Sequence, residues 1–265
     1  MILLDPLARP VIAHRGNRAH APENTIVSMR DAVAAGAEAL EFDVRVSLDG
    51  LLVLLHDATL DRTTNGRGPV AAQTVHALKL LDAGANFTID GGRTFPWRGR
   101  GVTVPLFDEV IDALPSDLPC IIELKTAAAT ELIRRAIRRH GIAHRVIVAG
   151  FDPQATRPLR GTGIALGAST PDVAAMVLPA LVGRLVRTPP CQALCIPRRW
   201  HGIPLPIAAL TRALRGSGTV THIWTINDPR HALRLWQHGV HGIISDDPAR
   251  IIAARHLHLE ARPRL

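Results

Sequence analysis

The chain has 265 residues, enough for one α/β barrel or for two small domains. Its formal net charge is +8, but aromatic residues make up only 3% of the chain, and no basic stripe is interleaved with aromatic side chains. We therefore expect no nucleic-acid partner, and the positive charge favours an anionic substrate instead.

The apolar stretches of the sequence predict the cellular compartment of the protein and whether it is inserted in a membrane. The first ten residues, MILLDPLARP, lack the basic start and long apolar core of a signal peptide. The longest apolar stretch, 173–186, contains a proline and a glycine and is too short to span a bilayer. Three cysteines form neither a disulfide framework nor a structural zinc site. We therefore expect a cytoplasmic protein that is not inserted in a membrane.

Apolar runs alternate with helical patterns along the whole chain. Continuous apolar runs are typical of strands that are buried on both faces of a parallel sheet. The predicted strands are 10–13, 39–44, 51–55, 119–124, 145–150, 163–168, 193–196, 222–226 and 242–245. Helices are predicted over 25–35 and 129–140, each closed by a glycine, and a third follows Asp247-Pro248. This alternation predicts a TIM (β/α)8 barrel that forms a single domain over residues 1–265.

Nine predicted strands are one too many for an eight-stranded barrel. Asp49-Gly50 is a hairpin signal, so 51–56 returns antiparallel to the preceding strand and forms a ribbon over about 43–56. A two-residue loop pairs residues 48 and 51 and places Asp43 opposite His56. The stretch 57–118 then becomes an elaborated loop region near the barrel mouth, with a helix near 106–114.

Three carboxylates end predicted strands and indicate a metal site. Glu41 and Asp43 are two residues apart and share the face of their strand that points into the barrel, while Glu123 ends the strand in CIIELK. Close carboxylates repel each other unless a cation neutralises them. Pairing with Arg15 or Arg45 is the alternative. An oxygen-only ligand set favours Mg²⁺ or Ca²⁺, with Mn²⁺ as a further candidate.

Two histidines also follow apolar runs. His14 in VIAHRG and His56 in LLVLLHD are candidates for a general acid and base near neutral pH. Arg15 and Lys125 supply positive charge for a phosphate. Trp224 ends a predicted strand and either walls the pocket or belongs to the core. Asp246 and Asp247 are interpreted as helix-capping residues.

Ten short motifs occur in an order that resembles one known family. They are HRG at 14–16, APENT at 21–25, EFDV at 41–44, LDG at 48–50, HD at 56–57, LDRTTNGRG at 60–68, VPLFDEV at 104–110, ELK at 123–125, WTIN at 224–227 and GVHGIISDDP at 239–248. The chain resembles the glycerophosphodiester phosphodiesterase family along nearly its whole length. It departs at Gly150, where that family often has serine, and at His241, where it often has aspartate. Neither change touches the candidate metal or catalytic residues, and both are expected to alter the pocket mouth.

The resemblance implies a TIM barrel that hydrolyses glycerophosphodiesters to an alcohol and sn-glycerol 3-phosphate. It implies that Glu41, Asp43 and Glu123 bind a divalent cation. It implies that His14 and His56 act as the general acid and base. It also implies that Arg15, Lys125 and Trp224 bind the substrate. Two alternatives are a lysophospholipase D acting on larger lipids and a catalytically silent barrel that binds anions or a membrane surface. The resemblance carries no expectation for the oligomeric state.

Overall fold

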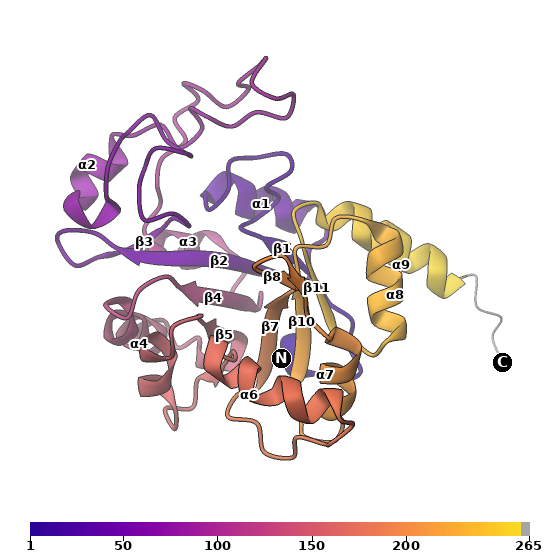
Figure 1. Ribbon diagram of the computed structural model, residues 1–265. Helices are drawn as coiled ribbons and strands as arrows, with labels where there is room; N and C mark the ends of the chain where they lie inside the picture. Colours follow the sequence, from indigo (N-terminus) through magenta and orange to yellow (C-terminus); the bar gives the residue numbers. More distant parts are fainter. Residues whose placement is uncertain (261–265) are drawn as a thin grey trace.

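The computed structural model describes residues 1–260 and confirms the predicted barrel (Figure 1). Its eight parallel strands are β1 (Val11–His14), β2 (Ala39–Val46), β4 (Cys120–Leu124), β5 (Val146–Ala149), β6 (Ala165–Leu166), β7 (Ala193–Pro197), β10 (Val220–Trp224) and β11 (Gly242–Ser245). They follow the order β6-β5-β4-β2-β1-β11-β10-β7. A bridge between Gly167 and Ala193 joins the two ends, so the ring is nearly closed.

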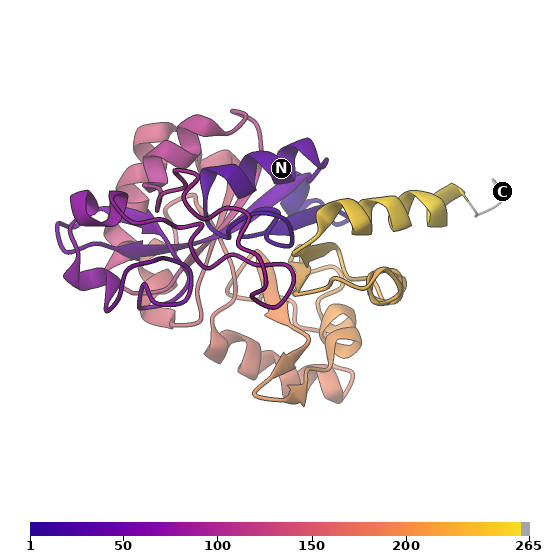
Figure 2. The same ribbon diagram turned by 90° about the horizontal axis from the view of Figure 1, so that it is seen from above.

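Helices surround the ring and connect successive strands (Figure 2). They are α1 (Ile26–Ala34), α2 (Val75–Lys79), α3 (Phe107–Ala113), α4 (Ala129–His140), α5 (Pro153–Thr156), α6 (Thr170–Leu181), α7 (Ile207–Ala213), α8 (Pro229–Gln237) and α9 (Pro248–Glu260). The predicted end of α4 is confirmed, because Gly141 adopts the left-handed conformation with φ +67°. Within residues 1–260, none of the helices has the length and apolar character needed to cross a membrane.

The predicted ribbon is present, but its predicted register is wrong by one residue. Strand β3 (Leu52–Leu54) pairs antiparallel with β2, and Val44 lies opposite Leu54. Asp43 therefore faces Leu55 and not His56, and the Leu55 amide donates to the Asp43 carbonyl at 3.2 Å. The turn has three residues, 48–50, because the Ser47 hydroxyl bonds the Asp49 carboxylate and accepts from the Leu51 amide, which stabilises a wider loop.

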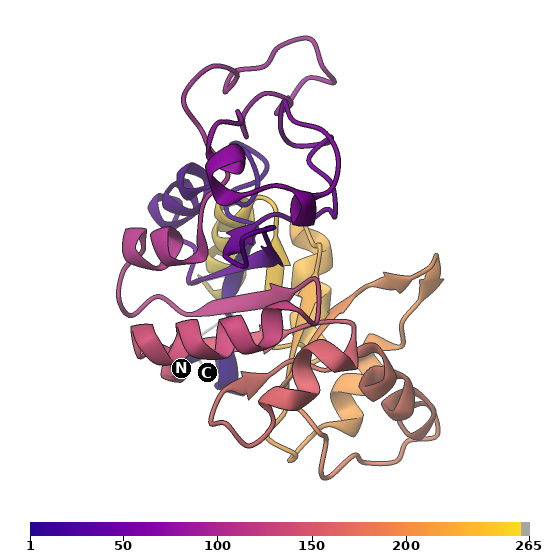
Figure 3. The same cartoon turned by 90° about the vertical axis from the view of Figure 1, so that its left-hand side faces the viewer.

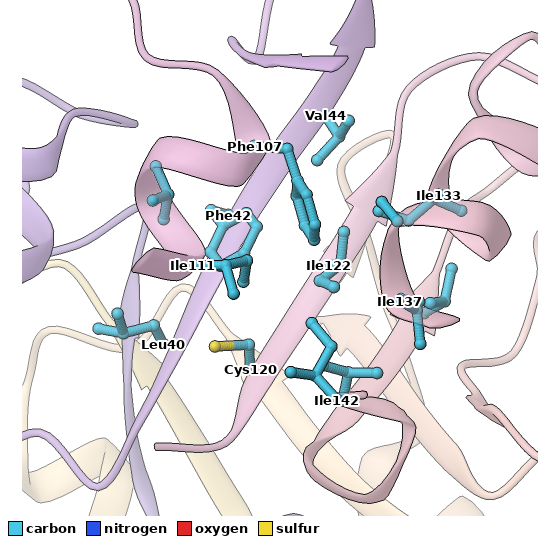
Figure 4. Packing of buried hydrophobic residues seen from close by; sticks show 14 of the residues in the cluster. Leu40, Phe42, Val44, Phe107, Ile111, Cys120, Ile122, Ile133, Ile137 and Ile142 are labelled. Carbon is cyan, nitrogen blue, oxygen red and sulfur yellow. The ribbon is translucent and has the colours of Figure 1, made fainter. Parts of the chain in front are cut away.

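Alternation along the strands separates an inner and an outer layer of side chains. On β2, Leu40, Phe42 and Val44 point outward into a cluster with helices α1, α3 and α4, which Figure 4 shows around Phe107 and Ile133. Side chains of the opposite parity point into the lumen. The lower lumen is filled by apolar side chains, namely Leu3, Ile12, Ala39, Ile121, Ile147, Ala193, Val220 and Ile244. The upper lumen carries the polar residues described below.

Two segments elaborate the mouth of the barrel. The stretch 57–118 forms loops with α2 and α3 and rises above the barrel, as predicted, although α2 itself was not expected (Figure 3). A short hairpin of β8 (Arg199–Trp200) and β9 (Ile203–Pro204) follows β7 and was also not expected. With two residues in each strand, this hairpin is too short to give a recognisable alternation of polar and apolar residues.

Candidate active site

The polar side chains gather at the carboxyl ends of the parallel strands. The parallel register places His14 beside Glu41 and Asp43 beside Glu123. Because these residues alternate with outward-facing apolar ones, they enter the lumen just above its apolar filling. One pocket is lined by seven of the eight candidate site residues that were selected from the sequence, including Trp224. The eighth, Asp43, is not part of the pocket wall. The structure therefore brings the predicted site residues together.

The three carboxylates form a tight and mostly buried cluster. Glu41, Asp43 and Glu123 each offer an oxygen within 4.8 Å of the others. Burial raises the pKa of Glu41 well above its ordinary value, and the negative charges of Asp43 and Glu123 raise it further. Burial and the neighbouring Asp43 also raise the pKa of Glu123. The protein thus holds together acidic groups that repel one another when ionised.

Two cations offset part of this negative charge. The Lys125 ammonium contacts Asp43 at 2.9 Å and also contacts Glu123, while Arg15 Nε lies 3.0 Å from Asp43. Although burial alone would raise the pKa of Asp43, Lys125 and Arg15 hold it below its ordinary value. Arg45, the other candidate partner, instead donates to the His56 carbonyl. The ion-pair alternative is therefore confirmed for Arg15 and not for Arg45.

The donor set fits a hard divalent cation. Two cationic side chains face three clustered carboxylates, and two of those carboxyls have raised pKa values. Carboxylate oxygens are the ligands that Mg²⁺ and Ca²⁺ prefer, and a bound cation relieves their mutual repulsion. Glu41, Asp43 and Glu123 are the residues that would hold the ion.

His14 is oriented by a carboxylate that the sequence analysis misassigned. Its Nδ1 lies 2.7 Å from the Asp246 carboxylate, and its Nε2 lies 3.9 Å from Glu41. Asp246 was expected to cap a helix, but only Asp247 caps α9, through a contact with the Arg250 amide. Asp246 directly follows β11, so the rule that polar residues end the strands could have identified it.

His56 has a similar partner in the next residue. Its Nδ1 lies 2.6 Å from Asp57, whose other oxygen accepts from Arg62 at 2.5 Å. Arg62 lowers the pKa of Asp57 to about 2. His56 lies in the loop that follows β3, so it reaches the pocket through the path of the chain and not through pairing with Asp43.

The loop between β1 and α1 supports the cluster from above. Asn24 donates to the Asp43 carboxylate at 2.9 Å and accepts from the Asp43 amide at 3.1 Å. Asn24 and Arg15 both have positive φ angles, and a Cβ on Gly16 would lie 2.4 Å from the Ser28 hydroxyl. This tight turn requires glycine at position 16. Thr25, and not Asn24, caps α1.

The two departures from the family pattern lie in different places. Gly150 lines the pocket, as expected. His241 was expected near the mouth, but it precedes β11 at the opposite end of the barrel and contacts the Thr221 amide. That expectation was wrong because residues just before a parallel strand lie at the far end from those that follow it.

Comparison with known proteins identifies the family of the chain. A sequence model of the glycerophosphoryl diester phosphodiesterase family matches residues 14–162. A glycerophosphodiester phosphodiesterase of Caldanaerobacter subterraneus subsp. tengcongensis is 31% identical over 254 residues, 91% of this chain and 96% of that protein.

Solved structures agree with this assignment. A glycerophosphodiester phosphodiesterase from Agrobacterium tumefaciens has a TM-score of 0.73 at 28% identity and covers 92% of this chain and 99% of its own. A phosphodiesterase from Oleispira antarctica in complex with the product sn-glycerol-3-phosphate has a TM-score of 0.74 at 27% identity, with 94% and 97% covered. The chain therefore belongs to the glycerophosphoryl diester phosphodiesterase family.

Proposed function

We propose that this protein is a divalent-cation-dependent phosphodiesterase that hydrolyses glycerophosphodiesters to an alcohol and sn-glycerol 3-phosphate. The observation that carries the proposal is the pairing of each lumen-mouth imidazole with an aspartate beside a three-carboxylate cluster. The named activities of the relatives and the product complex of the Oleispira antarctica enzyme support it. A divalent cation bound to the carboxylates supplies charge stabilisation for the phosphate in the transition state.

His14 and His56 are the proposed general acid and base. In each ring Nδ1 is held by an aspartate, so Nε2 is the nitrogen left to exchange a proton with the substrate. One Nε2 takes the proton of the attacking oxygen, and the other protonates the departing alcohol oxygen as its bond to phosphorus breaks. Burial lowers the pKa of both rings, which favours the neutral form needed by the base.

Arg15, Lys125 and Trp224 are the proposed substrate-binding residues. Arg15 and Lys125 line the pocket and carry charges that match a phosphodiester. Both contact Asp43, so they also fix the arrangement of the carboxylate cluster beside which the phosphate would bind. The Trp224 ring stacks toward His14, with their centroids 6.5 Å apart, and walls the same pocket.

A substrate panel run with and without a chelator tests this function. We expect glycerophosphocholine and glycerophosphoethanolamine to yield sn-glycerol 3-phosphate only when a divalent cation is present. Turnover that is unaffected by exhaustive chelation, or the absence of turnover with every cation, would contradict the proposal. Phosphorus NMR of the products then distinguishes the two possible nucleophiles, water and the glycerol 2-hydroxyl, because a cyclic phosphate appears only if the 2-hydroxyl attacks.

A catalytically silent barrel is the alternative from another class. It would bind phosphate or an anionic surface through Arg15 and Lys125 but hydrolyse nothing. The paired imidazoles favour the enzyme, because a purely anion-binding site gains nothing from rings whose Nδ1 atoms are fixed by aspartates. The same substrate panel separates the two, since the silent barrel yields no product under any condition.

A further inference from the structure

A second and larger chamber adjoins the polar pocket at the barrel mouth. Its volume is about 320 Å³, against about 60 Å³ for the polar pocket. The two share three wall residues, Phe151, Ala168 and Cys195. The chamber therefore lies directly beside the place where the phosphodiester would react, so one part of a substrate can occupy the chamber while its phosphate is in the polar pocket.

The wall of this chamber is almost entirely apolar. Helix α6 contributes Thr170, Val173, Ala174 and Val177, and the opposite side comes from β7, the β8–β9 hairpin and Leu205. None of its eleven lining residues carries a charge. An apolar wall of this kind offers no polar partner to a hydrated head group such as choline or ethanolamine, but it stabilises a hydrocarbon chain by removing part of its surface from water.

An aromatic wall connects the chamber to the proposed catalytic groups. The Trp224 ring that stacks toward His14 meets Phe151 edge-on at 6.0 Å, and Phe151 contacts Trp200 at 5.3 Å. The Lys125 ammonium lies 5.9 Å from the Phe151 ring, at the border between the two compartments. A molecule with its phosphate beside Lys125 therefore has a continuous apolar surface along which a chain can extend.

We propose that this chamber binds the hydrocarbon chain of a phosphodiester substrate, so that the enzyme acts on chain-bearing glycerophosphodiesters. The proposal rests on the proposed function for the reaction and adds the class of substrate. The chain can be an acyl group on the glycerol, as in a lysophospholipid, or an alkyl group of the leaving alcohol. In either case the attacking oxygen, from water or from a free glycerol 2-hydroxyl, loses its proton to the base and bonds to phosphorus, the bond to the leaving oxygen breaks, and the acid protonates that oxygen.

Two neighbouring alanines of α6 provide a matched test. Ala174 lines the chamber, Ala175 does not, and both are exposed on the helix surface, so either tolerates a larger side chain. Ala174→Trp fills the chamber, whereas Ala175→Trp adds the same ring outside it. Equal thermal midpoints for the two variants and the wild type establish that folding is unchanged.

Binding of n-alkyl phosphates from butyl to octyl, measured by titration calorimetry, tests the chamber without turnover. We expect the wild-type Kd to fall about fourfold per methylene, on the order of 10²-fold across the series. Ala175→Trp should keep this dependence and Ala174→Trp should lose it. A Kd that does not depend on chain length, or an equal loss in both variants, overturns the proposal.

Turnover then identifies which side of the phosphate carries the chain. One series has lysophosphatidylcholines of increasing acyl length, and the other has glycerophosphoalkanols of increasing alkyl length. A kcat/KM that rises with chain length in one series supports the proposal and assigns the chain to that side, whereas no rise in either overturns it. Cation-dependent turnover of glycerophosphocholine is the separate measure of the proposed function, so chain-dependent binding without any turnover refutes that function alone.

Discussion

The barrel lumen holds a buried histidine at each end, and the two have different surroundings. His14 at the mouth is bonded to the Asp246 carboxylate at 2.7 Å and lies beside Glu41. His222 at the bottom is bonded to the uncharged Leu3 carbonyl, at 2.9 Å, beside the apolar side chains of the lower lumen. Burial lowers the pKa of both, and it brings that of His222 to about 4. A buried histidine can exchange protons near neutral pH only where a charged partner opposes its desolvation.

The same contrast extends to the two layers of the lumen. The lower layer is apolar and is closed by the N-terminal residues around Leu3, so it stabilises the fold. The upper layer brings like charges together, which costs stability, and its groups are held by specific contacts such as that between Asn24 and Asp43. In this barrel the side chains that stabilise the fold fill the lower lumen, and the candidate functional side chains lie in the upper lumen.

Removing the histidines at the mouth should have the largest effect on turnover. We expect His14→Ala and His56→Ala each to lower kcat by at least about 10²-fold, the lower end for general acid–base catalysis. The His222→Gln variant should retain kcat within about twofold, because its side chain lies outside the pocket. Steady-state kinetics of the three purified variants makes the comparison. Near-normal kcat in His56→Ala would refute the role assigned to that residue.

The histidine at the bottom should instead control stability at mildly acid pH. Between pH 6.5 and 4 the unfolded chain protonates at position 222 while the folded protein does not, so stability falls as the pH decreases. The loss reaches about 3 kcal/mol, from a pKa difference of about 2.5 units.

Denaturant unfolding at several pH values, compared between wild type and His222→Gln, isolates this contribution. The difference between the two free energies of unfolding should change with pH between 6.5 and 4 and stay constant above pH 7. A difference that does not depend on pH would show that His222 has the same pKa in the folded protein as in the unfolded chain, against the environment described here.

The aspartate behind His14 should have a smaller effect on turnover. Asp246→Asn keeps the size of the side chain but removes its charge, so we expect kcat to fall about 10- to 100-fold with little change in KM. Asp247→Asn is the matched control, since asparagine also caps helices and Asp247 does not contact the imidazole of His14. Equal losses of kcat in the two variants would show that Asp246 has no specific role in positioning His14.

Much of the fold could be predicted because its signals are local. Buried parallel strands appear as continuous apolar runs. Helix α4 was predicted with both ends correct, and Gly141 marks its C-terminal end. The ribbon was predicted from Asp49-Gly50, but its register depends on side-chain bonds of Ser47 that lengthen the turn by one residue. The β8–β9 hairpin has too few residues per strand to give any pattern.

The site could be predicted only in part, for a related reason. Polar residues in apolar strands identified Glu41, Asp43, Glu123 and His14, because the parallel topology brings the carboxyl ends of these strands to one face. His56 also follows an apolar run, but it comes after the antiparallel strand β3. The partner of His14 is 232 residues away in the sequence, and no local pattern pairs them. The apolar chamber is formed by α6, β7 and a hairpin that meet only in the folded chain, so composition gave no indication of it.

The most direct test of the central claim is the binding of Mg²⁺ or Ca²⁺ to the carboxylate cluster. Titration calorimetry should show one cation site per chain in the wild type. Glu41→Gln should weaken that site strongly, because it removes one of the three clustered carboxylates. The Glu131→Gln variant, which changes an exposed carboxylate on α4, should bind the cation as the wild type does. Equal affinity in all three proteins, or no binding while cation-dependent hydrolysis continues, would contradict the account.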